Sequence, residues 1–254
     1  KEFSSKELTQ TFIDKIEKED KYNAYITKNF ENAIQKAEEC DKNIAKGEVK
    51  KLEGLPIVVK DIFCTKGIRT TCGSKILENF IPPYESTVTK KLNDENYILL
   101  GKTNMDEFAC GSTTMTSYFG PSINPYKTKG DDRDLIPGGS SGGSAAALAA
   151  NLCLAAAGTD TGGSIRQPAA LCNLVGIKPT YGRVSRYGII AYASSFDQAG
   201  WLTKDISDAS YLTDIICGYD EKDSTSTKKE STNFYKNLNA NIKGKKVGII
   251  KEFL

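Results

Sequence analysis

The chain is organised around residues 137–164, which read PGGSSGGSAAALAANLCLAAAGTDTGGS. Two glycine-rich clusters bracket this stretch, one containing Ser140 and Ser141 and the other covering residues 161–164. Glycine tolerates positive φ and lets the backbone approach a ligand closely, so each cluster is suited to directing N–H groups at an anion. The small, helix-forming residues between them predict a buried helix over residues 144–157, which would hold the clusters at fixed positions, as a catalytic site requires.

The length and net charge of the chain are those of a globular protein. Its 254 residues are enough for a full hydrophobic core, and we expect one domain over residues 1–254. The net charge is only +2 and the acidic and basic residues are interspersed, so no overall field marks a nucleic-acid-binding protein. Residues 228–246 are locally basic, and we interpret them as solvated surface.

The numbers of cysteine and histidine residues limit the catalytic mechanisms and metal sites that this chain can support. The seven cysteines form no CxxC pair, which favours a reducing compartment. The chain contains no histidine, so Ser-His-Asp and Cys-His catalysis, HExxH zinc sites and two-His-one-carboxylate iron sites are excluded. We therefore expect no metal site, and any nucleophile needs a base other than imidazole. Five of the cysteines are interpreted as packing residues, namely Cys64, Cys72, Cys110, Cys153 and Cys172.

The two ends of the sequence bear on localisation. Neither shows a secretory signal, a transit peptide or an apolar run of membrane-spanning length. We therefore expect a cytoplasmic protein without membrane contact, or one from an organelle interior if a leader was lost. The first residue is lysine, and residues 245–254 (KKVGIIKEFL) read as the beginning of a strand. These features favour a fragment of a longer protein.

Hydrophobic periodicity predicts helices that alternate with short strands, as in a sheet covered by helical layers. Ser4 and Glu7 form a capping box for the first helix, and Gly47 is placed to end the second. Loops are expected over residues 117–136, and an exposed excursion over 219–240, with loop and strand over 181–192. The predicted helices are residues 4–20, 30–46, 86–96, 165–172 and 205–217, and the predicted strands are 55–59, 97–100 and 174–177.

The strand over residues 55–59 delivers Lys60 and Asp61 to its end. One interpretation is a Lys60–Asp61 pair at a solvent-exposed strand terminus, which the strand taken alone favours. The alternative is a base, because a neutral lysine is the strongest candidate to activate a serine in a chain without histidine. Keeping Lys60 neutral near pH 7 requires lowering its pKa by roughly three units, or about 4–5 kcal/mol, which burial can supply.

The two glycine-rich clusters resemble the signature of the amidase signature family. They read GGSSGGS over residues 138–144 and DTGGSIR over residues 160–166. The resemblance implies a Ser-cisSer-Lys triad, with Ser164 as nucleophile, Ser140 as the bridging serine in a cis peptide and Lys60 as base. The implied fold is a mixed β-sheet sandwiched between helical layers, truncated here after its first half. The implied oxyanion hole consists of backbone N–H groups around Thr161, Gly162 and Gly163.

Four further segments resemble one branch of that family, the amidase subunits of heterotrimeric tRNA-dependent amidotransferases. This resemblance implies that glutamine is hydrolysed and that the ammonia passes to a partner subunit, which amidates Glu-tRNA(Gln) or Asp-tRNA(Asn). ATP and magnesium would belong to the partner, so no cofactor is expected in this chain. Side chains that bind glutamine are expected mostly beyond Leu254. The segments are residues 101–112, 119–125, 176–200 and 220–226.

Two departures from the branch pattern are an insert at residues 127–134 and Trp201 in place of proline. Three alternatives to the amidotransferase interpretation stay open. The first is a free-standing amidase that hydrolyses another carboxamide with the same triad. The second is a nucleotide-binding protein, against which the GKT of residues 101–103 lacks the upstream glycine of a phosphate loop. The third is an inactive scaffold.

Overall fold

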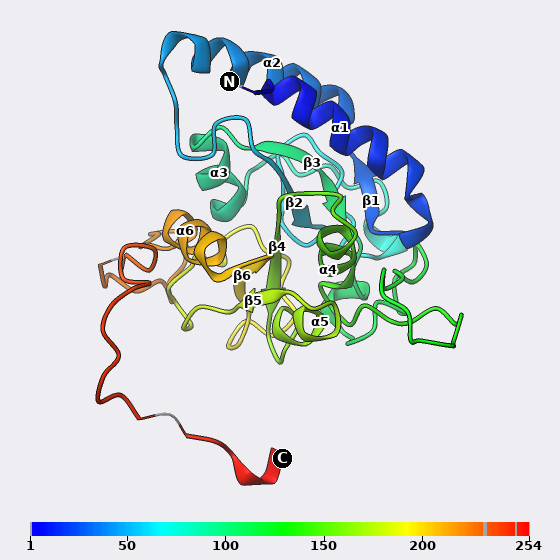
Figure 1. The fold of residues 1–254 in the computed structure, drawn as a ribbon, viewed down its shortest axis with the longest axis vertical. Coiled ribbons are helices and arrows are strands. Elements are labelled where there is room, and N and C mark those ends of the chain that lie inside the picture. Colours follow the sequence, from blue (N-terminus) through cyan, green and yellow to red (C-terminus); the bar gives the residue numbers. More distant parts are fainter. Residues whose placement is uncertain (1, 231–232, 247, 254) are drawn as a thin grey trace.

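The computed structural model describes residues 2–230, 233–246 and 248–253. Within these residues six strands form one mixed sheet in the order β1-β3-β2-β4-β6-β5, with helices on both faces (Figure 1). β2 is parallel to β3 and β4, whereas β1, β5 and β6 run antiparallel to their neighbours. The expected α/β architecture is confirmed. The strands are β1 Tyr25–Lys28, β2 Pro56–Lys60, β3 Ile98–Thr103, β4 Ala155–Asp160, β5 Val175–Ile177 and β6 Gln198–Thr203.

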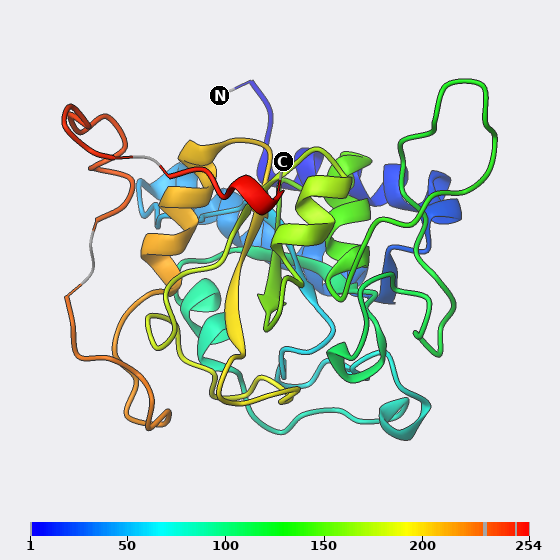
Figure 2. The ribbon, with the colours of Figure 1, turned by 90° about the horizontal axis from the view of Figure 1, so that it is seen from below.

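Helices cover the two faces of the sheet in separate groups. Figure 2 shows α3 and α6 on one side of β4 and β6, with α4 and α5 on the other. The α-helices are α1 Ser5–Lys18, α2 Phe30–Lys46, α3 Thr87–Asp94, α4 Gly142–Ala149, α5 Arg166–Leu171 and α6 Ile206–Ile216. Short 3-10 turns are η1 Asp20–Tyr22, η2 Lys75–Leu77, η3 Glu107–Ala109 and η4 Lys251–Phe253.

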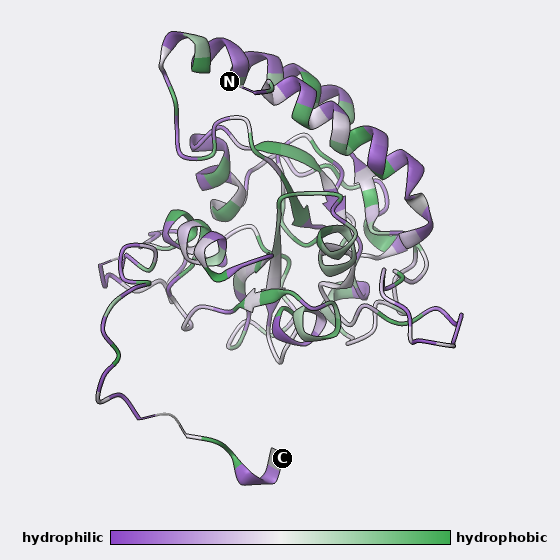
Figure 3. Ribbon diagram, in the orientation of Figure 1, coloured by the Kyte–Doolittle hydropathy of each residue, from purple (hydrophilic) through white to green (hydrophobic). Residues whose placement is uncertain are grey.

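The core on each face follows from the alternation of side chains along the strands. In β2, Val58 joins the apolar cluster under α1, α2, α4 and α5, whereas Ile57 and Val59 join the cluster under α3 and α6. Figure 3 shows hydrophobic residues on β2 and β3 and hydrophilic ones along the outer sides of α1 and α2. Continuous apolar strands are expected where both faces of a sheet are covered.

The expected ends of the first two helices are confirmed. The Ser4 side chain accepts a hydrogen bond from the Glu7 N–H, and the Glu7 carboxylate accepts one from the Ser4 N–H at 2.7 Å. Gly47 ends α2 in the left-handed conformation with φ 81°. These caps satisfy backbone groups that a helix leaves unpaired at its ends.

The helix predicted over residues 144–157 is wrong in its second half. α4 ends at Ala149, Asn151 has φ 57°, and the chain returns as the central strand β4 from Ala155. Helix propensity is a weak preference that tertiary context overrides, and the small side chains of β4 allow close packing between β2, β6 and α4. A continuous helix of that length would have separated the two glycine clusters by about 20 Å. The helix and the returning strand instead bring both clusters to one edge of the sheet.

Other differences concern strands. β1 and β6 were not predicted, and no strand forms over residues 181–192, where an isolated bridge joins Phe63 to Ile189. The strand expected over 245–254 is absent from its described residues, while Val247 and Leu254 lie outside them. β6 (QAGWLT) was missed because its apolar run is short, is interrupted by Gly200 and is bounded by the polar residues Gln198 and Thr203. Gly200 is required there because an added Cβ would lie 2.1 Å from Ile177 O on β5.

The polar excursion after α6 is confirmed in part. Figure 1 shows the chain leaving α6 as an extended segment, and much of it is exposed. Its first part is nevertheless attached, because Asp220 accepts hydrogen bonds from Thr87 Oγ1 and Ser185 Oγ, and Asp223 is buried. The insert at residues 127–134 lies in a segment without helix or strand, as expected for the surface loop over 117–136.

Gly143, in the first turn of α4, offers a test of the packing. An added Cβ would lie 2.4 Å from Asn104 N, 2.5 Å from Asn104 O and 2.7 Å from Ala24 O. These are backbone atoms, so Gly143→Ala is expected to lower the free energy of unfolding by about 3 kcal/mol. Urea denaturation followed by the fluorescence of Trp201, the only tryptophan, measures this loss. Gly248→Ala is the control, since nothing lies within 4 Å of its added Cβ; equal stability of both variants would contradict the packing argument.

Candidate active site

One edge of the sheet gathers the residues that the sequence singled out. β2 and β4 are parallel and paired, with Val59 opposite Ala157, so their carboxyl ends meet there. β2 ends at Lys60 and β4 at Asp160. α4 packs on β4 and begins at the same edge, directly after Ser140 and Ser141. Residues distant in sequence are thereby positioned by rigid elements.

Lys60 is fully buried, and its amine contacts two hydroxyls. Nζ lies 2.6 Å from Ser140 Oγ and 2.8 Å from Thr159 Oγ1. Burial lowers the pKa of Lys60 from 10.5 to about 7, although nearby acidic groups such as Cys72 and Asp106 act in the opposite direction. The amine is therefore substantially neutral near physiological pH.

The alternative of a solvent-exposed Lys60–Asp61 pair is wrong. Asp61 is buried too, but its carboxylate accepts hydrogen bonds from the N–H and hydroxyl of Thr71 and lies 3.7 Å from Lys102 Nζ. Lys102 in turn donates to Phe63 O and Thr70 Oγ1. A strand end covered by neighbouring loops explains the difference, because sequence alone does not show how those loops fold back.

The shifted pKa of Lys60 predicts a pH dependence of stability. Between the folded pKa of about 7 and the ordinary value of 10.5, the unfolded chain binds a proton at Lys60 that the folded chain does not. Rising pH therefore favours the folded state there by about 1.4 kcal/mol per pH unit, while below about pH 7 the cost of burying the charge is present in full. The unfolding free energy of the wild type minus that of Lys60→Met should rise from about pH 7 to 9. Parallel curves would contradict the shift.

Ser140 is held by contacts on both sides. The Gly139–Ser140 peptide bond is cis, as the family resemblance implied. The Gly139 N–H donates to Gln167 Oε1 at 2.9 Å, and the Asp106 N–H donates to Ser140 O at 3.3 Å. The Asp106 carboxylate accepts further hydrogen bonds from Thr114 and its neighbours. An added Cβ at Gly139 would lie 2.1 Å from Asp106 Oδ2, so glycine is required for this approach.

Ser164 lies half-buried beside a cavity of about 350 Å³. The Ser141 N–H donates to Ser164 O at 3.2 Å. Among the hydrogen bonds of the described residues, none joins Ser164 Oγ to Ser140 Oγ, so only the Lys60–Ser140 half of the expected relay is formed. The cavity is lined by Ala109, Gly111, Ser112, Gly139, Gly162, Gly163, Ser164, Gln167 and Tyr192.

The backbone before Ser164 supplies potential oxyanion donors. The N–H groups of Thr161, Gly162 and Gly163 donate no hydrogen bond to any group in the described part of the chain. Gly163 has φ 145°, which side-chain-bearing residues rarely adopt, and nothing lies within 4 Å of a Cβ added at Gly162. N–H groups left open at a cavity wall are suited to a developing negative charge.

An ion pair fixes the chain on the other side of Ser164. Asp160 is buried and accepts hydrogen bonds from the N–H groups of Ile165 and Arg166 and from the Arg166 guanidinium, at 2.9–3.2 Å. Burial raises the pKa of Asp160, but the Arg166 contacts outweigh it and hold that pKa below its ordinary value. Sequence reasoning gave no role to Asp160, Thr159, Gln167 or Asp106. For Asp160 a signal was present, since it belongs to the quoted DTGGSIR block.

The packing interpretation of the cysteines holds with one exception. Cys64, Cys72, Cys153 and Cys172 are buried, and burial raises the pKa of each thiol. Cys110 is exposed, so its assignment to packing is wrong; its sulfur lies 3.9 Å from Tyr192 OH. Cys110 directly follows η3, in which Phe108 and Ala109 have positive φ.

Neither a membrane span nor a metal cluster occurs within the described residues. No helix among them is long and apolar enough to cross a membrane. No group of three or more histidine, cysteine, aspartate or glutamate side chains in this part of the chain is arranged to hold a metal ion.

The site combines a buried amine with a pKa near 7, a hydroxyl 2.6 Å from it, a second serine at a cavity and open backbone N–H groups. Such an arrangement can support hydrolysis by a serine without histidine. A sequence profile of the family described as Amidase matches residues 7–254. The chain belongs to the amidase family.

Relatives and solved structures agree with this membership. The chain is 55% identical over 253 residues to the A subunit of glutamyl-tRNA(Gln) amidotransferase from Hyphomonas neptunium, covering 100% of this chain and 52% of that protein. It is 56% identical over 253 residues to the protein of the same name from Pelagibacter ubique, covering 100% of this chain and 51% of the relative. The chain thus spans about half the length of the curated relatives it matches.

Two solved structures show the same fold. The crystal structure of the A subunit of glutamyl-tRNA(Gln) amidotransferase from Thermotoga maritima superimposes with a TM-score of 0.76 at 42% identity, covering 89% of this chain and 46% of that one. A bacterial aryl acylamidase of the amidase signature family superimposes with a TM-score of 0.84 at 33% identity, covering 93% and 49%.

Proposed function

We propose that this chain is the catalytic portion of a glutamine amidohydrolase subunit in a tRNA-dependent amidotransferase. The observation that carries the chemistry is the 2.6 Å contact between Lys60 Nζ and Ser140 Oγ in a buried site. The choice of glutamine, rather than another amide, is supported by the names of relatives at 55% and 56% identity.

In the proposed reaction the neutral amine of Lys60 accepts a proton from Ser140, which takes the proton of Ser164 as Ser164 Oγ attacks the carboxamide carbon. N–H groups around Thr161, Gly162 and Gly163 stabilise the oxyanion. The proton returns along the same relay to the leaving nitrogen, so the C–N bond breaks and ammonia departs. Water then attacks the Ser164 ester, with Lys60 again as base, and glutamate is released.

The relay needs Ser164 Oγ to approach Ser140 Oγ. Ser164 is half-buried at the cavity, and its hydroxyl is not held by another hydrogen bond among the described residues. Rotation of this side chain is therefore unhindered by a competing partner. Catalytic hydrogen bonds are often long in unliganded sites and shorten when substrate binds.

The proposed substrate needs groups that this cavity does not offer. None of its lining residues carries a charged side chain, whereas glutamine has an α-amino and an α-carboxylate group. We place the side chains that bind these groups in a part of the protein after Leu254. This agrees with a chain that spans about half the length of its relatives, as the first portion of one amidase domain.

The same proposal specifies which molecule accepts the ammonia and which subunits take part. Ammonia passes to the other subunits of the complex, where Glu-tRNA(Gln), or Asp-tRNA(Asn), is amidated with ATP and magnesium bound by the partner. No cofactor is assigned to this chain. The proposed location is the cytoplasm, where aminoacyl-tRNA is used, or an organelle interior if a leader was lost.

The test compares amides in the full-length protein assembled with its partner subunits. Ammonia release is measured from glutamine, from acetamide and from a long-chain acyl amide at equal concentration. Preference for glutamine, with ammonia transferred to Glu-tRNA(Gln) when ATP is present, supports the proposal. Hydrolysis of the other amides without glutaminase activity would replace it by a free-standing amidase, and ATP binding by this chain alone would favour a nucleotide-binding protein.

A further inference from the structure

Asp197, the residue before β6, has a buried carboxylate that contacts two separate segments. Its side chain is 4% exposed. Oδ1 accepts a hydrogen bond from Thr161 Oγ1 at 2.5 Å, and the carboxylate accepts others from the N–H groups of Tyr192 at 2.9 Å and Ala193 at 3.1 Å. A buried carboxylate with several donors is a rigid connection, because each donor offsets part of its desolvation.

Both segments contribute to the lining of the cavity beside Ser164. Thr161 begins the loop that presents the Gly162 and Gly163 N–H groups, and Tyr192 lines the cavity from the segment before Asp197. Asp197 therefore joins the oxyanion loop to the segment of Tyr192 and Ala193 through one side chain. No ion pair of Asp197 occurs among the described residues, so its fixed partners are these donors.

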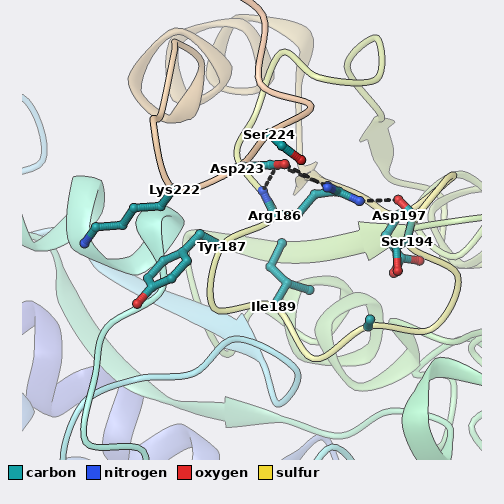
Figure 4. A pocket seen from close by; sticks show the side chains of 9 residues that line it. Arg186, Tyr187, Ile189, Ser194, Asp197, Lys222, Asp223 and Ser224 are labelled. Atoms are coloured by element: carbon teal, nitrogen blue, oxygen red, sulfur yellow. Dashed lines mark hydrogen bonds and ion pairs between the residues drawn. The ribbon is translucent and has the colours of Figure 1, made fainter.

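The guanidinium of Arg186 is paired with another carboxylate, that of Asp223 (Figure 4). Arg186 pairs with Asp223, with NH2 2.7 Å from Oδ1, and donates to Ser194 O on the segment that carries Asp197. Arg186 therefore supports this segment at Ser194, whereas Asp197 holds it at Tyr192 and Ala193.

We propose that Asp197 is a positioning residue of the acyl-transfer site, which holds the oxyanion loop in place through the hydroxyl of Thr161. This rests on the proposed hydrolase function and adds a residue that acts through the loop rather than on substrate. The oxyanion donors are effective only if they are already in place when charge develops.

The negative charge of Asp197 predicts an effect on the pKa of Lys60 that support of the loop alone would not have. Burial lowers the pKa of Lys60, and the acidic groups that raise it are Cys72 from the loop after β2, Asp106 after β3, Asp160 on β4 and Asp197 before β6. Lys102, the buried cation on β3, is paired with Asp61. Removing the charge at position 197 therefore lowers the pKa of Lys60 further, and the acidic limb of kcat/KM moves to lower pH.

The experiment uses Thr161→Val, Asp197→Asn and the double variant in the full-length protein with its partners. Thr161→Val removes the hydroxyl donor and keeps the charge, and should lower kcat about 10- to 100-fold with little change in KM and none in the pH of the acidic limb. Asp197→Asn should lower kcat at least as much and move the limb to lower pH. The kcat of the double variant should be little lower than that of Asp197→Asn, because both substitutions break the same hydrogen bond between Thr161 and Asp197.

A second readout does not depend on glutamine. The rate at which a fluorophosphonate labels Ser164, followed by mass spectrometry, reports the oxyanion loop directly and should fall about 10-fold in the same variants. Glu53→Gln is the matched control, since Glu53 is another buried carboxylate, 7% exposed, that accepts hydrogen bonds from Asn43 and Asn96 far from the cavity. It should change thermal stability alone.

Two outcomes overturn the proposal. One is wild-type kcat and labelling rate in both single variants. The other is a loss in Asp197→Asn that Glu53→Gln reproduces at equal loss of stability, without movement of the pH limb. If the wild type does not hydrolyse glutamine, the proposed function fails, and the labelling rates still decide the role of Asp197.

Discussion

Lys60→Met is expected to lower kcat for glutamine hydrolysis about 10³- to 10⁴-fold, with little change in KM. Methionine has a similar volume but cannot accept a proton, so Ser140 would lose the base 2.6 Å from its hydroxyl. General base catalysis contributes about 10²–10⁴-fold, and members of a relay act as a unit. Steady-state release of ammonia and glutamate at about pH 8, in the full-length protein with its partners, measures the loss.

The control for this variant is Lys91→Met. Lys91 is a partly buried lysine, whose Nζ donates to Ile216 O and Cys217 O, residues at the end of α6. It should cost stability without a comparable loss of kcat. Fluorescence of the buried Trp201 verifies that both variants are folded. A folded Lys60→Met variant with more than about a tenth of the wild-type kcat would eliminate Lys60 as the base.

Ser164→Ala should reduce glutamine hydrolysis by at least about 10⁴-fold and remove the covalent intermediate altogether. Loss of the nucleophile in a serine hydrolase costs on the order of 10⁶ in kcat, leaving the rate that the oxyanion donors support without it. Ser164 is half-buried and its hydroxyl has no partner among the described residues, so stability should change little. Mass spectrometry of the trapped protein should find the acyl group on Ser164 in the wild type and no adduct in the variant.

Ser141→Ala is an informative companion because Ser141 lies next to the bridging serine but faces elsewhere. Its hydroxyl donates to Thr159 O at 3.1 Å rather than to Lys60. It should lose stability through an unsatisfied buried carbonyl and retain the acyl intermediate. An adduct on Ser141 in the Ser164→Ala protein, or undiminished transamidation, would assign the nucleophile differently or favour the scaffold alternative.

Local patterns predicted the outer helices well because their signals are local. The capping box at Ser4 and the glycine at position 47 act within one turn of the helix they end, and both are found in place. β2 was recognisable from its continuous apolar run. β6 was not, because Gly200 interrupts its short apolar run and is there to fit closely against β5.

For the candidate site, the residues together with the family resemblance singled out Lys60, Ser140 and Ser164, and the fold brings the elements that carry them to one edge. Thr159, Gln167, Asp106 and Asp197 escaped notice, since each acts by contacting a residue far away in the sequence. The separation between Asp197 and Thr161 is 36 positions, and Gln167 lies 28 positions from Gly139. No periodicity or spacing rule reports such pairs.

Composition alone establishes that these 254 residues offer no imidazole, and the order of the glycine- and serine-rich motifs carries the resemblance to the amidase family. The charge state of Lys60 belongs to the tertiary structure, because a lysine becomes a base near neutral pH only when surrounding strands and loops exclude water from its amine. The same holds for the return of residues 155–160 as a central strand. Alanine is compatible with helix and strand alike, and the neighbours it packs against determine which of them forms.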